Sequence, residues 1–162
     1  MPEHIDAAKF APLLCAGLTV FNSIRHMNIG YGETVAIQGL GGLGHLAVQY
    51  ANKFGLRVVA ISRGADKEDF ARQLGAHEYI DTDKSEPGAA LEKLGGAALI
   101  MTTSPNGQEI PELLRGLGPL GKLLILSCKR ITGFALEQHE TELTASIIVP
   151  GDVTIDPGTM VG

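Results

Sequence analysis

The feature that most constrains the fold of this chain is a glycine-rich turn between two elements of different periodicity. The run Thr34–Gln38 (TVAIQ) is apolar and β-branched, which predicts a short buried strand. It ends directly in the turn Gly39–Gly44 (GLGGLG). Residues His45–Phe54 then carry apolar side chains at helical spacing and stop at Gly55. A strand, a tight glycine turn and a helix in this order predict the first half of a βαβ unit.

The same alternation of strands and helices continues along most of the chain. Short apolar runs predict further strands, and amphipathic stretches lie between them. The predicted strands are Thr34–Gln38, Arg57–Ile61, Glu78–Asp81, Ala97–Met101 and Lys122–Leu126. The predicted helices are one or two within Ala7–Met27, then His45–Phe54, Asp66–Leu74, Asp83–Leu94 (interrupted by Pro87-Gly88) and Asn106–Leu117. This pattern predicts an α/β, Rossmann-like, doubly wound parallel sheet of about five or six strands with helices on both faces.

The alternation stops after Ser127, which divides the chain into two parts. Residues 1–127 are predicted to form the α/β domain, and residues 128–162 a divergent C-terminal segment. The stretch Cys128–Ser146 shows no clear period, and Ile147–Val149 is a short strand-like run. The segment Thr144–Ile148 (TASII) is a candidate edge strand. A strand there would cover an edge of the sheet, in its own molecule or across a dimer.

Composition argues against several classes of partner. The formal net charge is −5 and no stripe of Lys and Arg is present, so no nucleic-acid surface is predicted. No apolar run reaches the roughly 20 residues that span a bilayer, and the N-terminus lacks the basic and apolar regions of a signal peptide. The two cysteines, Cys15 and Cys128, form no CxxC pair, which fits a reducing compartment. We therefore expect a cytoplasmic protein that contacts no membrane.

The glycines of the turn predict a dinucleotide site. Gly39 would permit the tight turn, Gly41 would let the backbone approach a pyrophosphate, and Gly44 would let the helix pack closely on the strand. The helix that opens here would present free N–H groups and the positive end of its dipole to the phosphates. A purely structural turn is the alternative interpretation.

The end of the second predicted strand indicates which dinucleotide would bind. NAD sites place an Asp or Glu about 20 residues after the glycines, where it accepts hydrogen bonds from the ribose 2′-hydroxyl. This chain has Ser62 and Arg63 there, Lys67 one turn later, and Asp66 as the nearest acid. A hydroxyl and two cations would bind a 2′-phosphate that a carboxylate would repel, so we predict NADP(H). The alternative is that Arg63 and Lys67 only solvate the start of a helix.

Four segments carry a resemblance to a known family: APLLCAGLTVF, VAIQGLGGLGHLAVQYA, LGAHEYIDT and GPLGKLLILS. Over residues 11–127 the chain resembles the cofactor domain of zinc-type medium-chain alcohol dehydrogenases, notably the yeast-like and cinnamyl-type members. In that family NADPH or NADH exchanges a hydride with an aldehyde or alcohol while zinc polarises the oxygen. The resemblance implies a pyrophosphate site made by Gly39, Gly41, Gly42, Leu43, Gly44 and His45.

The resemblance also implies roles for residues around the cleft. Thr19 would lie near the nicotinamide, and Thr103 and Ser127 would line the cleft at strand ends; each is equally well interpreted as a capping hydroxyl. Cys15 matches a position where the family has a zinc-ligating cysteine. The family's other ligands come from an N-terminal catalytic domain that this sequence does not contain, so no zinc site is expected. Cys15 is then either a small buried hydrophobe or a ligand completed by another chain.

The sequence thus predicts an NADP(H)-binding domain of the alcohol dehydrogenase type that does not transfer hydride with zinc alone. A homodimer or a catalytic-domain partner would have to complete the cleft. One alternative is a non-redox lyase, isomerase or cyclase acting on a small natural-product-like substrate. Its acid–base groups could include Cys15, His45, Asp81 and Lys129. The other alternative is a regulatory protein that binds NADP(H) without turnover.

Overall fold

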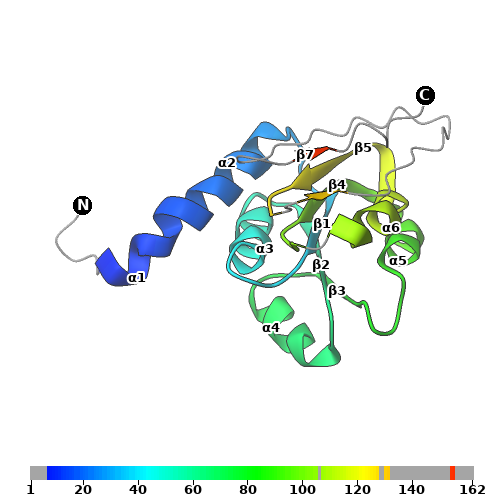
Figure 1. The fold of residues 1–162 in the computed structure, drawn as a ribbon, viewed down its shortest axis with the longest axis horizontal. Helices are drawn as coiled ribbons and strands as arrows, with labels where there is room; N and C mark the ends of the chain where they lie inside the picture. Colours follow the sequence, from blue (N-terminus) through cyan, green and yellow to red (C-terminus); the bar gives the residue numbers. More distant parts are fainter. Residues whose placement is uncertain (1–6, 106, 128–129, 132–153, 156–162) are drawn as a thin grey trace.

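The computed structural model describes residues 7–105, 107–127, 130–131 and 154–155. A five-stranded parallel sheet in the order β3-β2-β1-β4-β5 lies at its centre (Figure 1). The strands are β1 (Thr34–Gln38), β2 (Arg57–Ser62), β3 (Glu78–Asp81), β4 (Ala97–Thr102) and β5 (Leu117–Ile125). The predicted α/β class and the parallel sheet are confirmed, and the five predicted strands all form.

Helices cover both faces of the sheet, as a doubly wound fold requires. The helical elements are α1 (Ala7–Pro12), η1 (Leu13–Gly17), α2 (Leu18–His26), α3 (Gly44–Lys53), η2 (Ala65–Lys67), α4 (Glu68–Gln73), α5 (Pro87–Lys93), η3 (Gly107–Glu109) and α6 (Ile110–Leu114). Buried side chains of α2, α3 and α4 form one core with one face of the sheet. Those of α5 and α6 form a second core on the opposite face.

The strand sequences account for this two-sided burial. Alternate residues of β1 point to opposite faces, so Ile37 lies in the first core and Ala36 in the second. Both are fully buried, as are their neighbours Met101 and Ile100 on β4. Continuous apolar runs are typical of parallel strands because helices cover both of their faces.

Helix α5 begins at Pro87, later than the predicted start at Asp83. Proline is tolerated at the first position of a helix, where its missing N–H has no intrahelical partner. The predicted interruption at Pro87-Gly88 is therefore wrong, because this pair starts the helix. Gly88 also lets α5 approach α6: a Cβ there would lie 2.1 Å from the carbonyl oxygen of Glu112.

Strand β5 begins at Leu117, five residues before the predicted start, and α6 ends correspondingly early. Leu117 pairs with Ala97, and the register then shifts before Leu99 pairs with Lys122. Close backbone contacts permit this pairing, since a Cβ at Gly121 would lie 2.7 Å from the carbonyl oxygen of Ala97. The predicted helix through Leu117 is therefore wrong at its C-terminal end.

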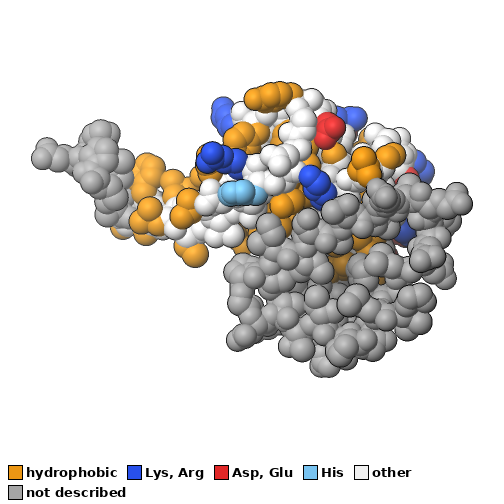
Figure 2. All heavy atoms as spheres, turned by 90° about the horizontal axis from the view of Figure 1, so that it is seen from above, with side chains coloured by type: hydrophobic (Ala, Val, Ile, Leu, Met, Phe, Trp, Pro, Cys, Tyr) orange, Lys and Arg blue, Asp and Glu red, His pale blue; other side chains and the backbone are white. Residues whose placement is uncertain are grey.

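The N-terminal helical elements extend away from the sheet (Figure 1). Phe10, Leu14 and Leu18 on this arm are 45%, 74% and 55% exposed, and hydrophobic side chains follow the arm in Figure 2. Cys15 lies on the same arm and is exposed. The interpretation of Cys15 as a buried hydrophobe is therefore wrong.

Two short strands come from the C-terminal segment. β6 (Arg130–Ile131) pairs in parallel with β7 (Thr154–Ile155) in a separate two-stranded sheet. The predicted edge strand Thr144–Ile148 lies outside the described residues, as do Cys128 and Lys129. None of the helices in the described ranges combines the length and apolar character needed to cross a bilayer.

Candidate dinucleotide site

The site is centred on the turn that leaves β1. Gly39 has a φ of +89°, a conformation that favours glycine, and its N–H donates to the carbonyl oxygen of Ile61 at 2.8 Å. The hydroxyl of Thr103 donates to the carbonyl oxygens of Gln38 at 2.9 Å and Gly39 at 3.2 Å. The turn is therefore held from both sides, by the end of β2 and by the residue that follows β4.

The four glycines of the turn fall into two pairs with different surroundings. A Cβ at Gly44 would lie 1.7 Å from the carbonyl oxygen of Gly39, so the start of α3 requires glycine there. A Cβ at Gly39 would lie 2.8 Å from the Thr103 hydroxyl oxygen. Gly41 and Gly42 are exposed, and a Cβ at either residue would meet nothing within 4 Å. The backbone of the turn is thus tightly packed at Gly39 and Gly44 and open at Gly41 and Gly42.

Helix α3 starts directly at this open surface. The N–H of His45 donates to the carbonyl oxygen of Gly41 at 3.0 Å, and its Nδ1 lies 3.1 Å from the same oxygen. Leu43 and His45 are half-buried beside the exposed Gly41 and Gly42. The first amides of a ten-residue helix carry the positive end of its dipole, which favours an anion at this end.

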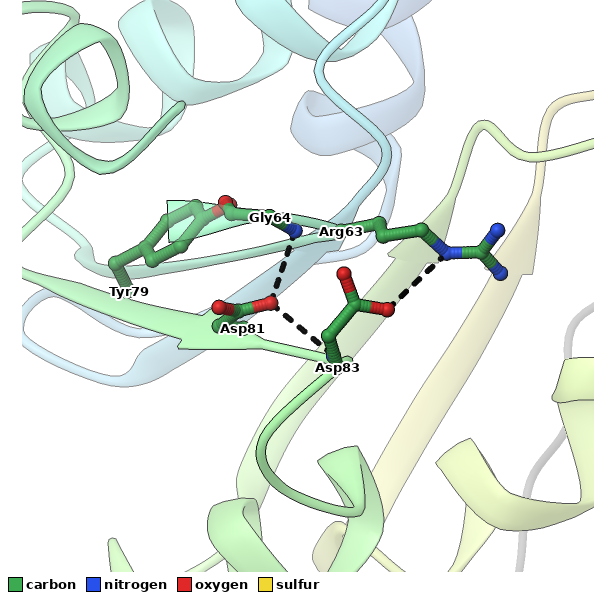
Figure 3. Close-up of polar contacts among 5 residues, drawn as sticks. All are labelled: Arg63, Gly64, Tyr79, Asp81 and Asp83. Carbon is green, nitrogen blue, oxygen red and sulfur yellow. Dashed lines mark hydrogen bonds and ion pairs between the residues drawn. The ribbon is translucent and has the colours of Figure 1, made fainter. Parts of the chain in front are cut away.

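A second loop follows β2 at the same edge of the sheet. Ser62 is the last residue of β2 and is half-buried, while Gly64 has a φ of +87°. The Tyr79 hydroxyl donates to the carbonyl oxygen of Gly64 at 2.6 Å, and the N–H of Gly64 donates to Oδ1 of Asp81 at 2.9 Å (Figure 3). Strand β3 therefore fixes the conformation of this loop through both backbone polar groups of one residue.

The charged state of Asp81 is favoured by these contacts. The N–H of Asp83, the N–H of Gly64 and the Lys84 ammonium together lower the pKa of Asp81, against the opposing effect of desolvation. Its Oδ1 accepts from Asp83 at 3.1 Å, and its Oδ2 lies 3.6 Å from Nζ of Lys84. Desolvation raises the pKa of Tyr79, so this hydroxyl stays a donor. Asp81 thus carries a stable negative charge that is already hydrogen-bonded.

The cationic residues of the loop are exposed. Nε of Arg63 lies 3.5 Å from Oδ1 of Asp83, and the two side chains are 75% and 57% exposed (Figure 3). Lys67, at the end of η2, is also exposed. Asp83 was not predicted as a site residue, because its contact with Arg63 depends on how β3 ends relative to β2. An acid two residues after the strand-terminal Asp81 was the available signal.

Buried polar side chains gather at this edge of the sheet. Among the residues whose burial the structure describes, Gln38, Asp81 and Thr102 end strands β1, β3 and β4, whereas a fourth buried polar residue, Ser23, lies on α2. The Thr102 hydroxyl donates to Oε1 of Gln38 at 2.5 Å, and Nε2 of Gln38 donates to Oε2 of Glu109. Gln38 and Glu109 were also missed in the sequence analysis, since nothing in their spacing relates them.

The three cleft residues implied by the resemblance occupy different elements. Thr103 directly contacts the turn, as described above. Ser127 is half-buried just beyond β5, whose Ile125 pairs with Thr102. Thr19 is half-buried on α2, a helix that packs on α3 through contacts such as Phe21 with Tyr50. The structure thus brings Thr103 to the turn and Ser127 to a neighbouring strand end.

Comparison with known families assigns the chain. The model of the family described as "zinc-binding dehydrogenase" matches residues 42–154. This chain is a member of the zinc-binding dehydrogenase family. The match begins inside the glycine turn, at Gly42, and it includes every strand of the sheet after β1.

Fungal alcohol dehydrogenases are among the similar curated proteins. Alcohol dehydrogenase patD of Aspergillus clavatus is 72% identical over 127 residues, which are 78% of this chain and 33% of that protein. Alcohol dehydrogenase notN of an Aspergillus species is 65% identical over 127 residues, 78% of this chain and 38% of that protein. The chain therefore spans about a third of the length of these relatives.

Solved structures of related dehydrogenases share the fold. The alcohol dehydrogenase of Aeropyrum pernix matches with a TM-score of 0.78 and 26% identity, over 94% of this chain and 47% of that one. The quinone oxidoreductase of Thermus thermophilus, also solved in complex with NADPH, matches with a TM-score of 0.76 and 27% identity, over 93% and 48%. The chain thus shares the fold of about half of each of these oxidoreductases.

The family name implies a zinc ion, and the side chains of this domain can be compared with the ligands that such an ion needs. A catalytic zinc needs three protein ligands. No group of three or more His, Cys, Asp or Glu side chains suited to a metal occurs among the described residues. The described residues around Cys15 therefore do not fit a catalytic zinc ion.

Proposed function

We propose that this domain binds NADP(H) as the cofactor half of an alcohol dehydrogenase-type oxidoreductase. The observation that carries the proposal is the turn after β1. Gly39 and Gly44 are sterically fixed, while Gly41 and Gly42 leave open space at the start of α3. A pyrophosphate can approach the backbone there and accept hydrogen bonds from helix amides. The proposed contacts are Gly39, Gly41, Gly42, Leu43, Gly44 and His45, with Thr19, Thr103 and Ser127 along the cleft.

The loop after β2 supports a preference for the 2′-phosphorylated cofactor. Ser62 occupies the strand end where a carboxylate would select the 2′-hydroxyl. The nearby Asp81 is 9% exposed and accepts hydrogen bonds from two backbone amides, so its carboxylate is engaged in holding the loop. The exposed cations Arg63 and Lys67 provide charge for a phosphate, although Arg63 must exchange its contact with Asp83.

Hydride transfer needs groups beyond those described here. The substrate must be held roughly 3–3.5 Å from the nicotinamide in a water-poor cleft. The relatives are about three times as long as the matched region, and a catalytic domain outside the matched region, in the same protein, a partner or another protomer, is part of the proposal. Residues 1–127 act as the nucleotide-binding unit in this proposal, and residues 128–162 as an attached segment.

The test is calorimetric titration of the chain with NADPH, NADP⁺ and NADH in parallel. We expect micromolar NADPH binding and weaker NADH binding. Ser62→Asp should weaken NADPH by about tenfold or more, because a carboxylate would face the 2′-phosphate. A wild-type chain that binds none of the three would refute the proposal. Turnover that ignores added cofactor would favour a non-redox enzyme instead.

A pair of arginine variants provides a matched control. Arg63 and Arg115 are both exposed and each forms one ion pair, with Asp83 at 3.5 Å and Glu86 at 3.2 Å. Arg63→Ala should weaken NADPH several-fold and leave NADH nearly unchanged, because only the 2′-phosphate is affected. Arg115→Ala removes the same charge from the far end of α6 and should change neither. Equal effects of both variants would indicate nonspecific electrostatics.

A further inference from the structure

A chain of hydrogen bonds runs between β1, β4 and η3 beneath the glycine turn. The N–H of Ser104 donates to Oγ1 of Thr102 at 3.3 Å, and the Thr102 hydroxyl donates to Oε1 of Gln38 at 2.5 Å. Nε2 of Gln38 then donates to the carboxylate of Glu109. The donors all point toward the negative charge, an arrangement in which neighbouring hydrogen bonds strengthen one another.

The position of this network in the fold relates it to ligand binding. β1 and β4 are adjacent in the sheet, but the chain leaves β1 toward β2 and leaves β4 toward β5 on the other side. Helix α3 after β1 and helix α6 after β4 accordingly pack on opposite faces. The reversal makes this pair of strands the topological switch point, where open α/β sheets bind their ligands.

Burial shows that the network is more than a surface contact. Gln38 and Thr102 are 4% and 1% exposed, at the end of a sheet whose interior is otherwise apolar. Polar groups at such depth are costly unless they are paired, and an apolar pair of similar size would fill the same space. The pairing links two loops that border the crevice, since Gln38 precedes Gly39 and Thr102 precedes Thr103.

The backbone of Gln38 forms part of the same connection. Its carbonyl oxygen accepts from the N–H and from the hydroxyl of Thr103, each at 2.9 Å. The side chain of Gln38 therefore fixes η3, while its backbone fixes the loop after β4. Gly39 is the next residue in the chain, so a shift of Gln38 that follows a change in its side chain also moves the glycine turn.

We infer that Gln38 is a positioning residue for the dinucleotide: joined to Thr102 and Glu109, its side chain sets the separation between the glycine turn and the loop after β4. The inference rests on the proposed nucleotide function. Neither Gln38 nor Thr102 needs to contact the nucleotide. Gln38 acts through the turn, whose amides would face the pyrophosphate, and its side-chain hydrogen-bond partners, Thr102 and Glu109, lie on the β4 side of the turn and not in the loop after β2.

The distinguishing experiment compares a long and a short ligand on folded variants. NADPH spans the glycine turn, whereas 2′-AMP lacks the pyrophosphate and reaches only the loop after β2. Gln38→Met keeps the side-chain length and removes both polar groups. We expect NADPH binding to weaken by about tenfold and 2′-AMP binding to change less than about twofold, with dissociation constants from NMR titration. A merely structural defect would weaken both ligands by the same factor, through the unfolded fraction.

Two more variants keep the inference testable if Gln38→Met does not fold. Gln49→Met makes the same chemical change on α3, where Nε2 donates to the carbonyl oxygen of His45 at 3.0 Å, and should leave NADPH affinity unchanged. Glu109→Ala removes the anionic end of the network from a half-buried position and should reproduce the NADPH-selective loss. If Glu109→Ala binds NADPH as tightly as the wild type does, the inference is overturned while the proposed function stands. A wild-type chain that binds neither ligand refutes the proposed function, and the inference with it.

Discussion

Replacing Gly44 by alanine is the most direct test of the turn geometry. The new Cβ would lie 1.7 Å from the carbonyl oxygen of Gly39, whereas real Cβ contacts stay above 3.0 Å. The obstructing atom belongs to the backbone, so no side chain can rotate away. Relief requires Gly39 to move, which breaks its 2.8 Å hydrogen bond to Ile61. Overpacking costs about 1–3 kcal/mol and the lost hydrogen bond about 1 kcal/mol, partly offset by helix propensity.

The expected loss is therefore about 3 kcal/mol in the free energy of unfolding. The chain has no tryptophan, so far-UV circular dichroism in a urea titration is the suitable assay. With an m-value of about 1.5 kcal/mol/M, the midpoint should fall by about 2 M. Gly41→Ala is the matched control, because nothing lies within 4 Å of its Cβ position. It should unfold like the wild type and bind NADPH more weakly. A midpoint for Gly44→Ala close to that of Gly41→Ala would refute the steric argument.

Two further predictions concern a carboxylate and a strained loop residue. The pKa of Asp81 is lowered in the folded chain, so its ionised form stabilises the fold above the ordinary carboxyl pKa of about 4, and this contribution is lost as the pH falls through the lowered value. Asp81→Asn should be less stable than wild type at neutral pH and should converge with it in urea titrations once the pH has fallen below the lowered pKa of Asp81; a constant difference at every pH would contradict the assignment. Leu120 has a φ of +56° and is 65% exposed, so Leu120→Gly should raise the free energy of unfolding by about 0.5–1 kcal/mol. A lower thermal midpoint for that variant would show that its apolar side chain matters more than backbone strain.

Local pattern was sufficient to predict the framework of this domain. β1 and β3 begin and end at the predicted residues, because β-branched apolar runs between turn signals leave little alternative. The glycine turn was recognisable from its spacing alone, and the structure gives Gly39 and Gly44 the steric roles that the pattern implies. Ser62 was likewise placed correctly at the end of β2. These features depend on residues close in sequence.

The contacts that shape the site depended on tertiary structure. Gln38 meets Glu109 across 71 positions of the sequence, and Gly64 meets Asp81 across 17. No periodicity encodes such pairs, since they exist only once β4 lies beside β1 and β3 lies beside β2. The register shift that extends β5 to Leu117 arises in the same way, from the backbone of Ala97. The sequence by itself determined the α/β order and the glycine turn, because those follow from local sterics and burial. Strand pairing decided which polar groups surround the turn, because it alone brings distant residues within hydrogen-bond distance.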